Sequence, residues 1–273
     1  MIPALGEREE TALSLLARFH FLTRSQLQAF LFPDGVHSEA SARVMTRRVL
    51  QRLTSQGLIS RTRRFIGGAC GGSGQHAYFP TTSGARLLSS PEARRQAPRG
   101  SFLLRHALAV ADVALSFKAA ALHRGERLAS FECDREAAQR IGSKTLVPDA
   151  FLIYEAKDVE LHAFLEVDLG TVGSRQFARK VETYLSLWRT GAWQEAHGLW
   201  PTVLVVVPDE ARLRLLLRAT EALLRRQPDE VAAQTEFAFA TASDIRAKGP
   251  LSPIWEVAGR TGRQGLLEGG AAR

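Results

Sequence analysis

The sequence has 273 residues, of which 45% are hydrophobic and 23% charged, values typical of a globular protein with one large domain or two smaller ones. No apolar run approaches the roughly 20 residues that a membrane-spanning helix needs, and the acidic N-terminus lacks the basic start of a signal peptide. The two cysteines, Cys70 and Cys133, are too few for a disulfide framework and predict free thiols in a reducing cytoplasm.

The positive charge is concentrated at one end of the chain. The net charge is +8, and the first hundred residues contain fourteen arginines, no lysine and six acidic residues, whereas residues 101–273 are balanced. Arginine's planar guanidinium suits phosphates and guanine edges better than an ammonium does. A solvated basic face or a GC-rich genome would also raise the arginine count, but base composition does not explain the segregation. We therefore expect the N-terminal part to bind nucleic acid.

The first 90 residues predict three helices followed by two strands. Apolar residues recur at helical spacing over 7–19, Thr23 begins a capping box for a helix over 23–31, and Ser38 is expected to cap a longer helix over 39–55. The segment LISRTRRF predicts a strand, GGACGGSG a loop and HAYFPTT a returning strand. This is the order of a winged helix-turn-helix, whose third helix enters the major groove and whose hairpin touches phosphate or the minor groove.

Residues on the third helix and on the first strand of the hairpin are candidate DNA contacts. The helix is expected to bury Ala42, Met45, Val49, Leu50 and Leu53 and to expose its opposite face. Exposed residues in its first turns suit base reading, and arginines on the strand suit phosphates, which position the protein without specifying sequence. The candidates are Arg43, Thr46, Arg47 and Arg48 on the helix, and Arg61, Arg63 and Arg64 on the strand.

The remainder of the chain predicts an α/β domain with a mixed sheet. Alternating helices and apolar strands give the order αβββαβαβ, and the run TVLVVVP is typical of a buried parallel strand. The expected helices cover 102–121, 174–188 and 210–226, and the expected strands cover 128–133, 146–154, 160–169, 202–208 and 236–240. The predicted domains are a winged helix at 1–90, a proline-containing linker at 91–101, the α/β domain at 102–245 and a C-terminal tail at 246–273.

Acidic residues lie at the open end of one predicted strand pair. If a four-residue connection joins the strands, Glu155 pairs with Glu160, and antiparallel register then places Asp149 opposite Glu166. Paired residues have Cβ atoms about 4.5–5.5 Å apart, close enough for two carboxylates to hold one cation. Asp168 is expected on the same face as Glu166. Because magnesium prefers carboxylate and water oxygens, these three acids predict a Mg²⁺ site.

This constellation resembles the PD-(D/E)xK nuclease superfamily, in which an Asp after a proline and an acid on the next strand bind magnesium. Pro148-Asp149 and Glu166 match those two elements, but Asp168 stands where the superfamily has a lysine. Some members supply the lysine from the following helix, a part that Lys180 could play here. The resemblance thus implies a restriction-endonuclease-like αβββαβ fold with Asp149, Glu166, Asp168 and Lys180 as catalytic residues.

A second resemblance covers nearly the whole chain. The segments TTSGARLL, RHALAVAD, VPDAFLIY, EVDLGT and RKVETY are similar to motifs of the plasmid replication-relaxation proteins, which combine a winged helix with a nuclease-like domain. The resemblance implies a DNA-binding accessory of a plasmid or other mobile element. Its expected partners are double-stranded DNA and, as further candidates, a second copy of the chain or other replication and transfer proteins, but no membrane.

Three functions remain open at the level of the sequence. The leading one is a cytoplasmic DNA-binding accessory acting in replication, mobilisation or its regulation. The second is an active magnesium-dependent DNA endonuclease, and the third is a winged-helix transcriptional regulator. The three acids of the predicted Mg²⁺ site could instead form a solvated strand face or ion pairs with Arg175, Arg179 and Lys180. A nuclease-like fold would not by itself establish cleavage, because fold does not fix function.

Overall fold

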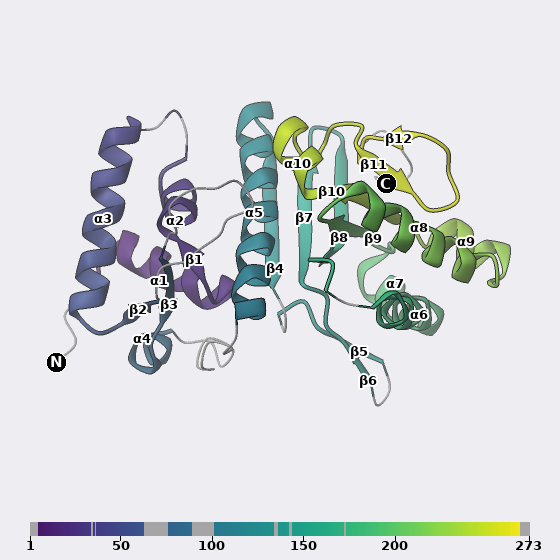
Figure 1. Ribbon diagram of the computed structural model, residues 1–273, viewed down its shortest axis with the longest axis horizontal. Coiled ribbons are helices and arrows are strands. Elements are labelled where there is room, and N and C mark those ends of the chain that lie inside the picture. Colours follow the sequence, from purple (N-terminus) through teal and green to yellow (C-terminus); the bar gives the residue numbers. More distant parts are fainter. Residues whose placement is uncertain are drawn as a thin grey trace. The chain divides into compact units, whose positions relative to one another are not determined.

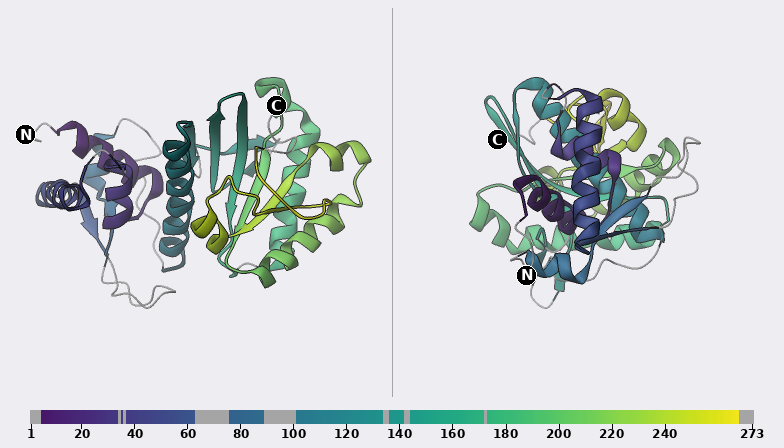
Figure 2. Two further views of the ribbon diagram at one scale, coloured as in Figure 1. Left: turned by 90° about the horizontal axis from the view of Figure 1, so that it is seen from above. Right: turned by 90° about the vertical axis from the view of Figure 1, so that its left-hand side faces the viewer.

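The computed structural model describes residues 5–33, 35, 37–62, 76–88, 101–133, 136–141, 144–171 and 173–267. The chain divides into two compact units, Met1–Leu115 and Ser116–Arg273, and the long helix α5 (Ser101–Arg124) contributes residues to both. Figures 1 and 2 show the elements of each unit. Within the described part of the chain, no helix is long and apolar enough to cross a membrane.

Unit 1 combines short helices with a small antiparallel sheet (Figure 1). Its elements before α5 are α1 (Glu7–Phe19), β1 (Leu22–Thr23), α2 (Arg24–Leu31), α3 (Glu39–Ser55), β2 (Ile59–Arg61), β3 (Ala77–Pro80) and α4 (Thr82–Leu87). The strands follow the spatial order β1-β3-β2. The three expected helices and the two expected strands are therefore present, and β1 is an additional short strand that the sequence did not predict.

Side-chain caps mark where α2 and α3 begin. At the start of α2 the backbone N–H of Gln26 donates to the Thr23 hydroxyl at 3.2 Å, and the backbone N–H of Thr23 donates to the Gln26 side chain at 2.9 Å. This is the predicted capping box, and it satisfies donors that a helix start leaves without intrahelical partners. The Ser38 hydroxyl likewise accepts from the backbone N–H of Ser41, as expected for the cap of α3.

The first half of α5 belongs to unit 1. The Gln26 amide, 6% exposed, donates to the Leu108 carbonyl at 2.9 Å and to the Asp112 carboxylate at 2.7 Å. Leu104 packs in an apolar cluster with Phe21 and Ala77. The expected start of the second domain at residue 102 thus falls inside a helix whose first half is held by unit 1.

Unit 2 is built on a seven-stranded mixed sheet with helices on both faces (Figure 2). Its strands are β4 (Arg127–Cys133), β7 (Ala150–Ala156), β8 (Val159–Val167), β9 (Thr202–Val207), β10 (Phe237–Thr241), β11 (Trp255–Val257) and β12 (Arg263–Gln264). A separate hairpin joins β5 (Gln139–Ile141) to β6 (Lys144–Leu146). The helices after α5 are α6 (Ser174–Thr190), α7 (Ala192–His197), α8 (Glu210–Leu224), α9 (Asp229–Gln234) and α10 (Ala242–Lys248).

The strand register agrees with the sequence-based expectation. Strands β7 and β8 are antiparallel with Glu155 opposite Glu160 and Ala150 opposite Leu165, so the next pair outward is Asp149 and Glu166. Strand β9 lies between β8 and β10 and is parallel to both, which confirms the buried parallel strand. Helix α5, strands β4, β7 and β8, helix α6 and strand β9 occur in the expected αβββαβ order, with the β5–β6 hairpin inserted after β4 and the short helix α7 inserted after α6.

The two faces of this sheet are packed differently. On the face covered by α6 and α8, large apolar residues from both helices and from β9 and β10 form one core that includes Phe164, Val205 and Phe239. On the face covered by α5, the Phe117 ring contacts Tyr154 with centroids 6.1 Å apart. Residues of opposite faces alternate along each strand, so Phe164 and Glu166 point toward α6 whereas Leu165 points away.

Two strands within residues 255–264 belong to the sheet, which corrects the expectation that 246–273 form a tail. Strands β11 and β12 extend the sheet beyond β10. Arg263 holds them in place through ion pairs with Asp244 at 2.9 Å, with Glu256 at 3.2 Å and with Glu210. The sequence did not reveal these strands because they are only two or three residues long.

Gly84 is the glycine of the TTSGARLL motif, and we predict that it cannot be enlarged. A Cβ at this position would lie 2.1 Å from the Leu58 carbonyl oxygen and 3.1 Å from a methyl carbon of Leu13. Gly84→Ala should lower the free energy of unfolding of unit 1 by about 1–3 kcal/mol, as overpacking does. Urea denaturation measures this. Ser83→Ala, exposed on the same helix, should be nearly neutral, and equal stability of the two variants would contradict the close approach.

Candidate functional site

A row of arginines covers the outer face of α3. Arg43, Arg47, Arg48 and Arg52 are exposed, and the opposite face of the helix buries Val49 with its apolar neighbours. Arg43 pairs with Glu39 one turn earlier, and Arg52 lies 3.4 Å from Glu9 on α1. Both pairs are exposed on at least one side, where ion pairs contribute little to stability. The exposed arginines on α3 thus present positive charge to solvent.

Thr46 does not belong to this surface, which corrects its assignment as a base-reading residue. It is fully buried, and its hydroxyl donates to the Ala42 carbonyl at 2.8 Å. The buried stripe of α3 follows the spacing 42, 46, 49, 50 and 53, so position 46 faces inward and Met45, expected inside, is only half-buried. A threonine suits this place because its hydroxyl is satisfied by the preceding turn.

The hairpin candidates are only partly within the described chain. Arg61 is exposed at the end of β2, where it pairs in register with Tyr78 of β3. Arg63 and Arg64 lie outside the described residues, so their roles stay predictions.

In unit 2, Asp149 and Glu166 lie side by side where β7 begins and β8 ends. The backbone N–H of Asp149 donates to the Leu165 carbonyl at 3.0 Å, which continues the strand ladder by one step. The Asp149 carboxylate accepts from the backbone N–H of Val167 at 2.7 Å. Asp149 is half-buried, whereas Glu166 is only 5% exposed. The expected neighbour relation of these two carboxylates is therefore present.

Helix α6 supplies the partners of the buried Glu166 carboxylate. Lys180 forms an ion pair with one carboxylate oxygen, and the Tyr184 hydroxyl donates to the other at 2.5 Å. The two residues are four apart and so lie on one face of the helix. Lys180 was expected near this site, but Tyr184 was not. The spacing of Lys180 and Tyr184 within RKVETY is the signal that would have revealed it.

Burial makes Glu166 an unusual acid. Removal from water raises its pKa to about 7, and the negative charge of Asp149 acts in the same direction, while Lys180 and Tyr184 oppose the rise. Burial also raises the pKa of the Tyr184 hydroxyl well above its ordinary value, with the Glu166 charge contributing. Tyr184 therefore remains a hydrogen-bond donor to Glu166 at neutral pH. A perturbed carboxyl group with a nearby cation is a common feature of functional sites.

Asp168 takes part in a different interaction, which corrects its assignment as a third metal ligand. Its carboxylate pairs with Arg212 of α8, at 2.5 Å to one guanidinium nitrogen and 3.3 Å to another, and it accepts from the backbone N–H of Gly170. Both side chains are largely buried. Asp168 shares the face of Glu166, as expected, but its charge is neutralised by Arg212.

The donor set for magnesium is accordingly smaller than predicted. No three His, Cys, Asp or Glu side chains gather at one point within the part of the chain that the structure describes. Asp149 and Glu166 are the two candidate ligands that remain. An ionised carboxylate offers about four lone-pair sites, so Glu166 keeps sites for a cation in addition to its bonds with Lys180 and Tyr184. Magnesium is often held by one or two carboxylates with water and phosphate as its other ligands. The pair fits such an ion.

Comparison with known proteins assigns the family. The family model described as "Replication-relaxation" matches residues 13–203, which is more than half of the chain, and the chain therefore belongs to the replication-relaxation family. A comparison with curated protein sequences gave no match.

Two solved structures share slight similarity with the chain. They are the restriction endonuclease FokI and FokI bound to DNA, each with 11% sequence identity and a TM-score of 0.27 over 87% of this chain. The match spans 42% and 43% of those chains, less than half of their length.

The raised pKa of Glu166 predicts a specific pH dependence of stability. Because the folded protein binds this proton more tightly than the unfolded chain does, the stabilisation is present below pH 4.5 and is lost as pH rises to about 7. Glu166→Gln should remove this contribution, so the free energy of unfolding should fall less steeply across that interval than in the wild type. Urea denaturation over a pH series measures both slopes. The exposed Glu182→Gln on α6 should keep the wild-type slope, and identical slopes in all three proteins would refute the raised pKa.

The Asp168–Arg212 pair should be structural. Arg212→Ala leaves a buried carboxylate without its cation and is expected to lower the free energy of unfolding by about 3 kcal/mol or more. The double variant Asp168→Ala with Arg212→Ala should recover part of that loss, since no unpaired charge remains. Arg214→Ala, exposed on the same helix, should change stability by less than about 0.5 kcal/mol. Strict additivity of the two alanine substitutions would exclude the pairing.

Proposed function

We propose that this protein is a DNA-binding accessory of a plasmid or other mobile element, acting in replication, mobilisation or its regulation. The observation that carries the proposal is the exposed arginine row of α3, formed by Arg43, Arg47, Arg48 and Arg52. Arginine side chains contact phosphate oxygens and guanine edges with two parallel hydrogen bonds. A rigid helix with one buried face holds them in a line that a DNA groove can accept.

Unit 1 is, in this proposal, a winged helix. Helices α2 and α3 would form the helix-turn-helix, and the β2–β3 hairpin would form the wing that carries Arg61. In such domains the recognition helix enters the major groove and neighbouring elements contact the backbone. Membership of the replication-relaxation family is consistent with a protein that binds DNA.

Removal of arginines from α3 tests the DNA-binding proposal. Each lost phosphate contact lowers the slope of log K against log salt by about one unit. Arg47→Ala with Arg48→Ala should therefore weaken binding to duplex DNA at least about tenfold and lower the slope by about two units. Fluorescence anisotropy over a salt series measures both quantities. The matched pair Arg214→Ala with Arg218→Ala removes the same charge from exposed positions of α8 and should leave the slope unchanged.

An unchanged slope in the α3 variant would show that this helix does not contact DNA. A slope lowered equally by the α8 pair would show that only total charge matters. Either result would contradict the proposal that α3 is the recognition helix.

A second candidate function is magnesium-dependent cleavage of DNA by unit 2. The observation in its favour is that Asp149 just before β7, Glu166 on β8 and Lys180 on α6 come together. Asp149 and Glu166 would hold the ion, which would polarise a phosphodiester and lower the pKa of a bound water. Lys180 pairs with Glu166 and would place positive charge beside the phosphate, while Tyr184 orients the Glu166 carboxylate. Asp168 has no part in this chemistry, because it pairs with Arg212.

Conversion of supercoiled plasmid in the presence of magnesium or manganese tests this candidate. The wild type should nick or linearise the plasmid, and Asp149→Ala and Glu166→Ala should each reduce the rate at least about a hundredfold. Glu160→Ala removes an exposed carboxylate from the same strand and should retain activity. Plasmid left intact by a wild type that still shifts it on a gel would exclude cleavage and leave the binding proposal standing.

A further inference from the structure

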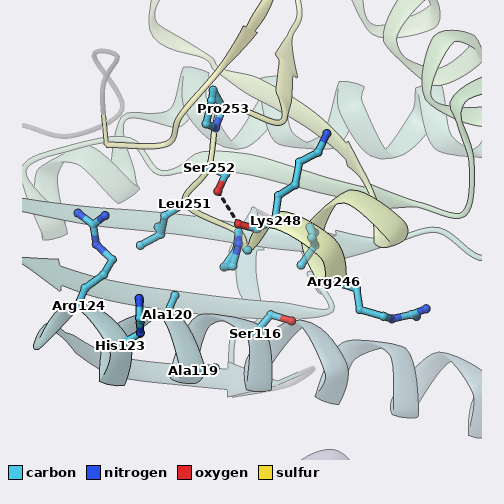
Figure 3. Close-up of a pocket in the computed structure, with 13 residues that line it drawn as sticks. Ser116, Ala119, Ala120, His123, Arg124, Arg246, Lys248, Leu251, Ser252 and Pro253 are labelled. Atoms are coloured by element: carbon cyan, nitrogen blue, oxygen red, sulfur yellow. Dashed lines mark hydrogen bonds between the residues drawn. The ribbon is translucent and has the colours of Figure 1, made fainter.

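Unit 2 contains a pocket on the sheet face opposite to Glu166. It lies between the second half of α5 and the segment from Ile245 in α10 through the following loop to Pro253, and its volume is about 550 Å³ (Figure 3). Binding sites for small molecules commonly have volumes of about 300–1,000 Å³. Because Glu166 points toward α6, this pocket is separate from the candidate metal site.

The loop that forms one wall is held in a fixed shape. The indole N–H of the fully buried Trp255 donates to the Pro250 carbonyl at 2.7 Å, and the Ser252 hydroxyl donates to the Lys248 carbonyl at 2.5 Å. Gly249 has a φ of 86°, a conformation that glycine adopts without strain. A wall fixed before binding loses little entropy when a ligand arrives.

Basic residues surround the pocket. Arg124 and His123 come from the end of α5, and Arg246 and Lys248 come from α10, whereas no acidic residue is among the described residues that line the pocket. Figure 3 shows these four side chains around its margin. Glu126 accepts from Arg124 at 2.8 Å and Asp244 accepts from Lys248 at 2.9 Å, but each contact uses one donor of a group that has several. The margin therefore retains donors for an anion.

Part of the pocket lining is small or apolar. Ala119, Ala120 and Leu251 form this part, with Ser116 and Ser252 as hydroxyl-bearing neighbours. Alanine side chains leave room for a flat ring, and aliphatic carbons provide a surface on which it can pack. Arg246 and Lys248 on one side of the pocket and Ala120 and Leu251 toward the other match a ligand with phosphate at one end and a heterocycle at the other.

We propose that this pocket binds a free nucleotide, with its phosphates held by Arg246 and Lys248 and its base packed against Ala120 and Leu251. A phosphate of DNA is the other source of the same chemistry, but a pocket of about 550 Å³ has the size of a small-molecule site. The site lies outside the α3 surface and outside the Asp149–Glu166 pair, so it adds a ligand to the proposed function.

Isothermal titration calorimetry on the full chain tests the proposal with ADP, adenosine and inorganic phosphate as probes. ADP should bind saturably, and adenosine and phosphate should each bind at least about tenfold more weakly, because each lacks one half of the recognised group. Absence of ADP binding by folded protein, or adenosine or phosphate binding as tightly as ADP, would overturn the proposal.

Three variants locate the site. Arg246→Gln with Lys248→Gln should weaken ADP binding at least about tenfold, and Ala119→Trp, which fills the pocket without changing charge, should abolish it. Arg214→Gln with Arg218→Gln alters two exposed cations on α8 and should leave ADP affinity within about twofold. Equal losses in this control pair would show nonspecific attraction and reject the pocket, and thermal unfolding checks that each variant is folded.

A competition experiment separates the two sources of phosphate. A single-stranded oligonucleotide without terminal phosphates should not displace ADP from the wild type. Displacement of ADP from the wild type, together with direct binding of the oligonucleotide that is lost in the Ala119→Trp protein, would identify the DNA backbone as the occupant and overturn the free nucleotide. Because the α3 arginines are intact in all these proteins, failure of nucleotide binding leaves the DNA-binding proposal untouched.

Discussion

The buried carboxylate of Glu166 is the constraint on which the core of unit 2 depends. Taking an ionised group out of water costs several kcal/mol unless it is paired and hydrogen-bonded. Lys180 and Tyr184 meet that requirement, and both come from α6. The apolar stripe of α6, which includes Phe177 and Val181, packs into the same core. Two kinds of contact therefore fix the position of α6 on the sheet. They are the apolar packing of its buried stripe and the ion pair and hydrogen bond that it provides to Glu166.

A second buried acid fixes the neighbouring helix. Asp168 stands two residues beyond Glu166 and binds Arg212 in the first turn of α8. The end of β8 thus holds two helices by two separate polar contacts. Polar networks of this kind specify one arrangement of helices, because a shifted helix would leave a charge without its partner. In unit 1 the buried Gln26 amide of α2 similarly donates hydrogen bonds to Leu108 and Asp112 of α5.

Much of this architecture could be predicted from the sequence, because its signals are local. The β7–β8 connection is short enough to fix the strand register. The position of Asp149 beside Glu166 could therefore be found by counting residues along both strands from the pair Glu155 and Glu160. The partner of Asp168 could not be found in that way, since Arg212 is 44 positions further along the chain. Thr46 shows a different limit, because its inward position follows from the i, i+4 spacing to Ala42, but a polar residue type suggested the surface. Short strands such as β11 and β12 carry too few residues for a pattern.

The extension of the sheet past β10 bears on how the chain can be divided. The family match ends at residue 203, inside β9, whereas β10, β11 and β12 continue the same sheet for another 60 residues or so. A chain shortened at residue 245 would keep β9 and β10 but lose β11. The backbone donors and acceptors of β10 that pair with β11 would then be exposed. Such edges pair with other chains and promote aggregation. The residues after 245 thus cover the edge of β10 and complete the sheet of unit 2.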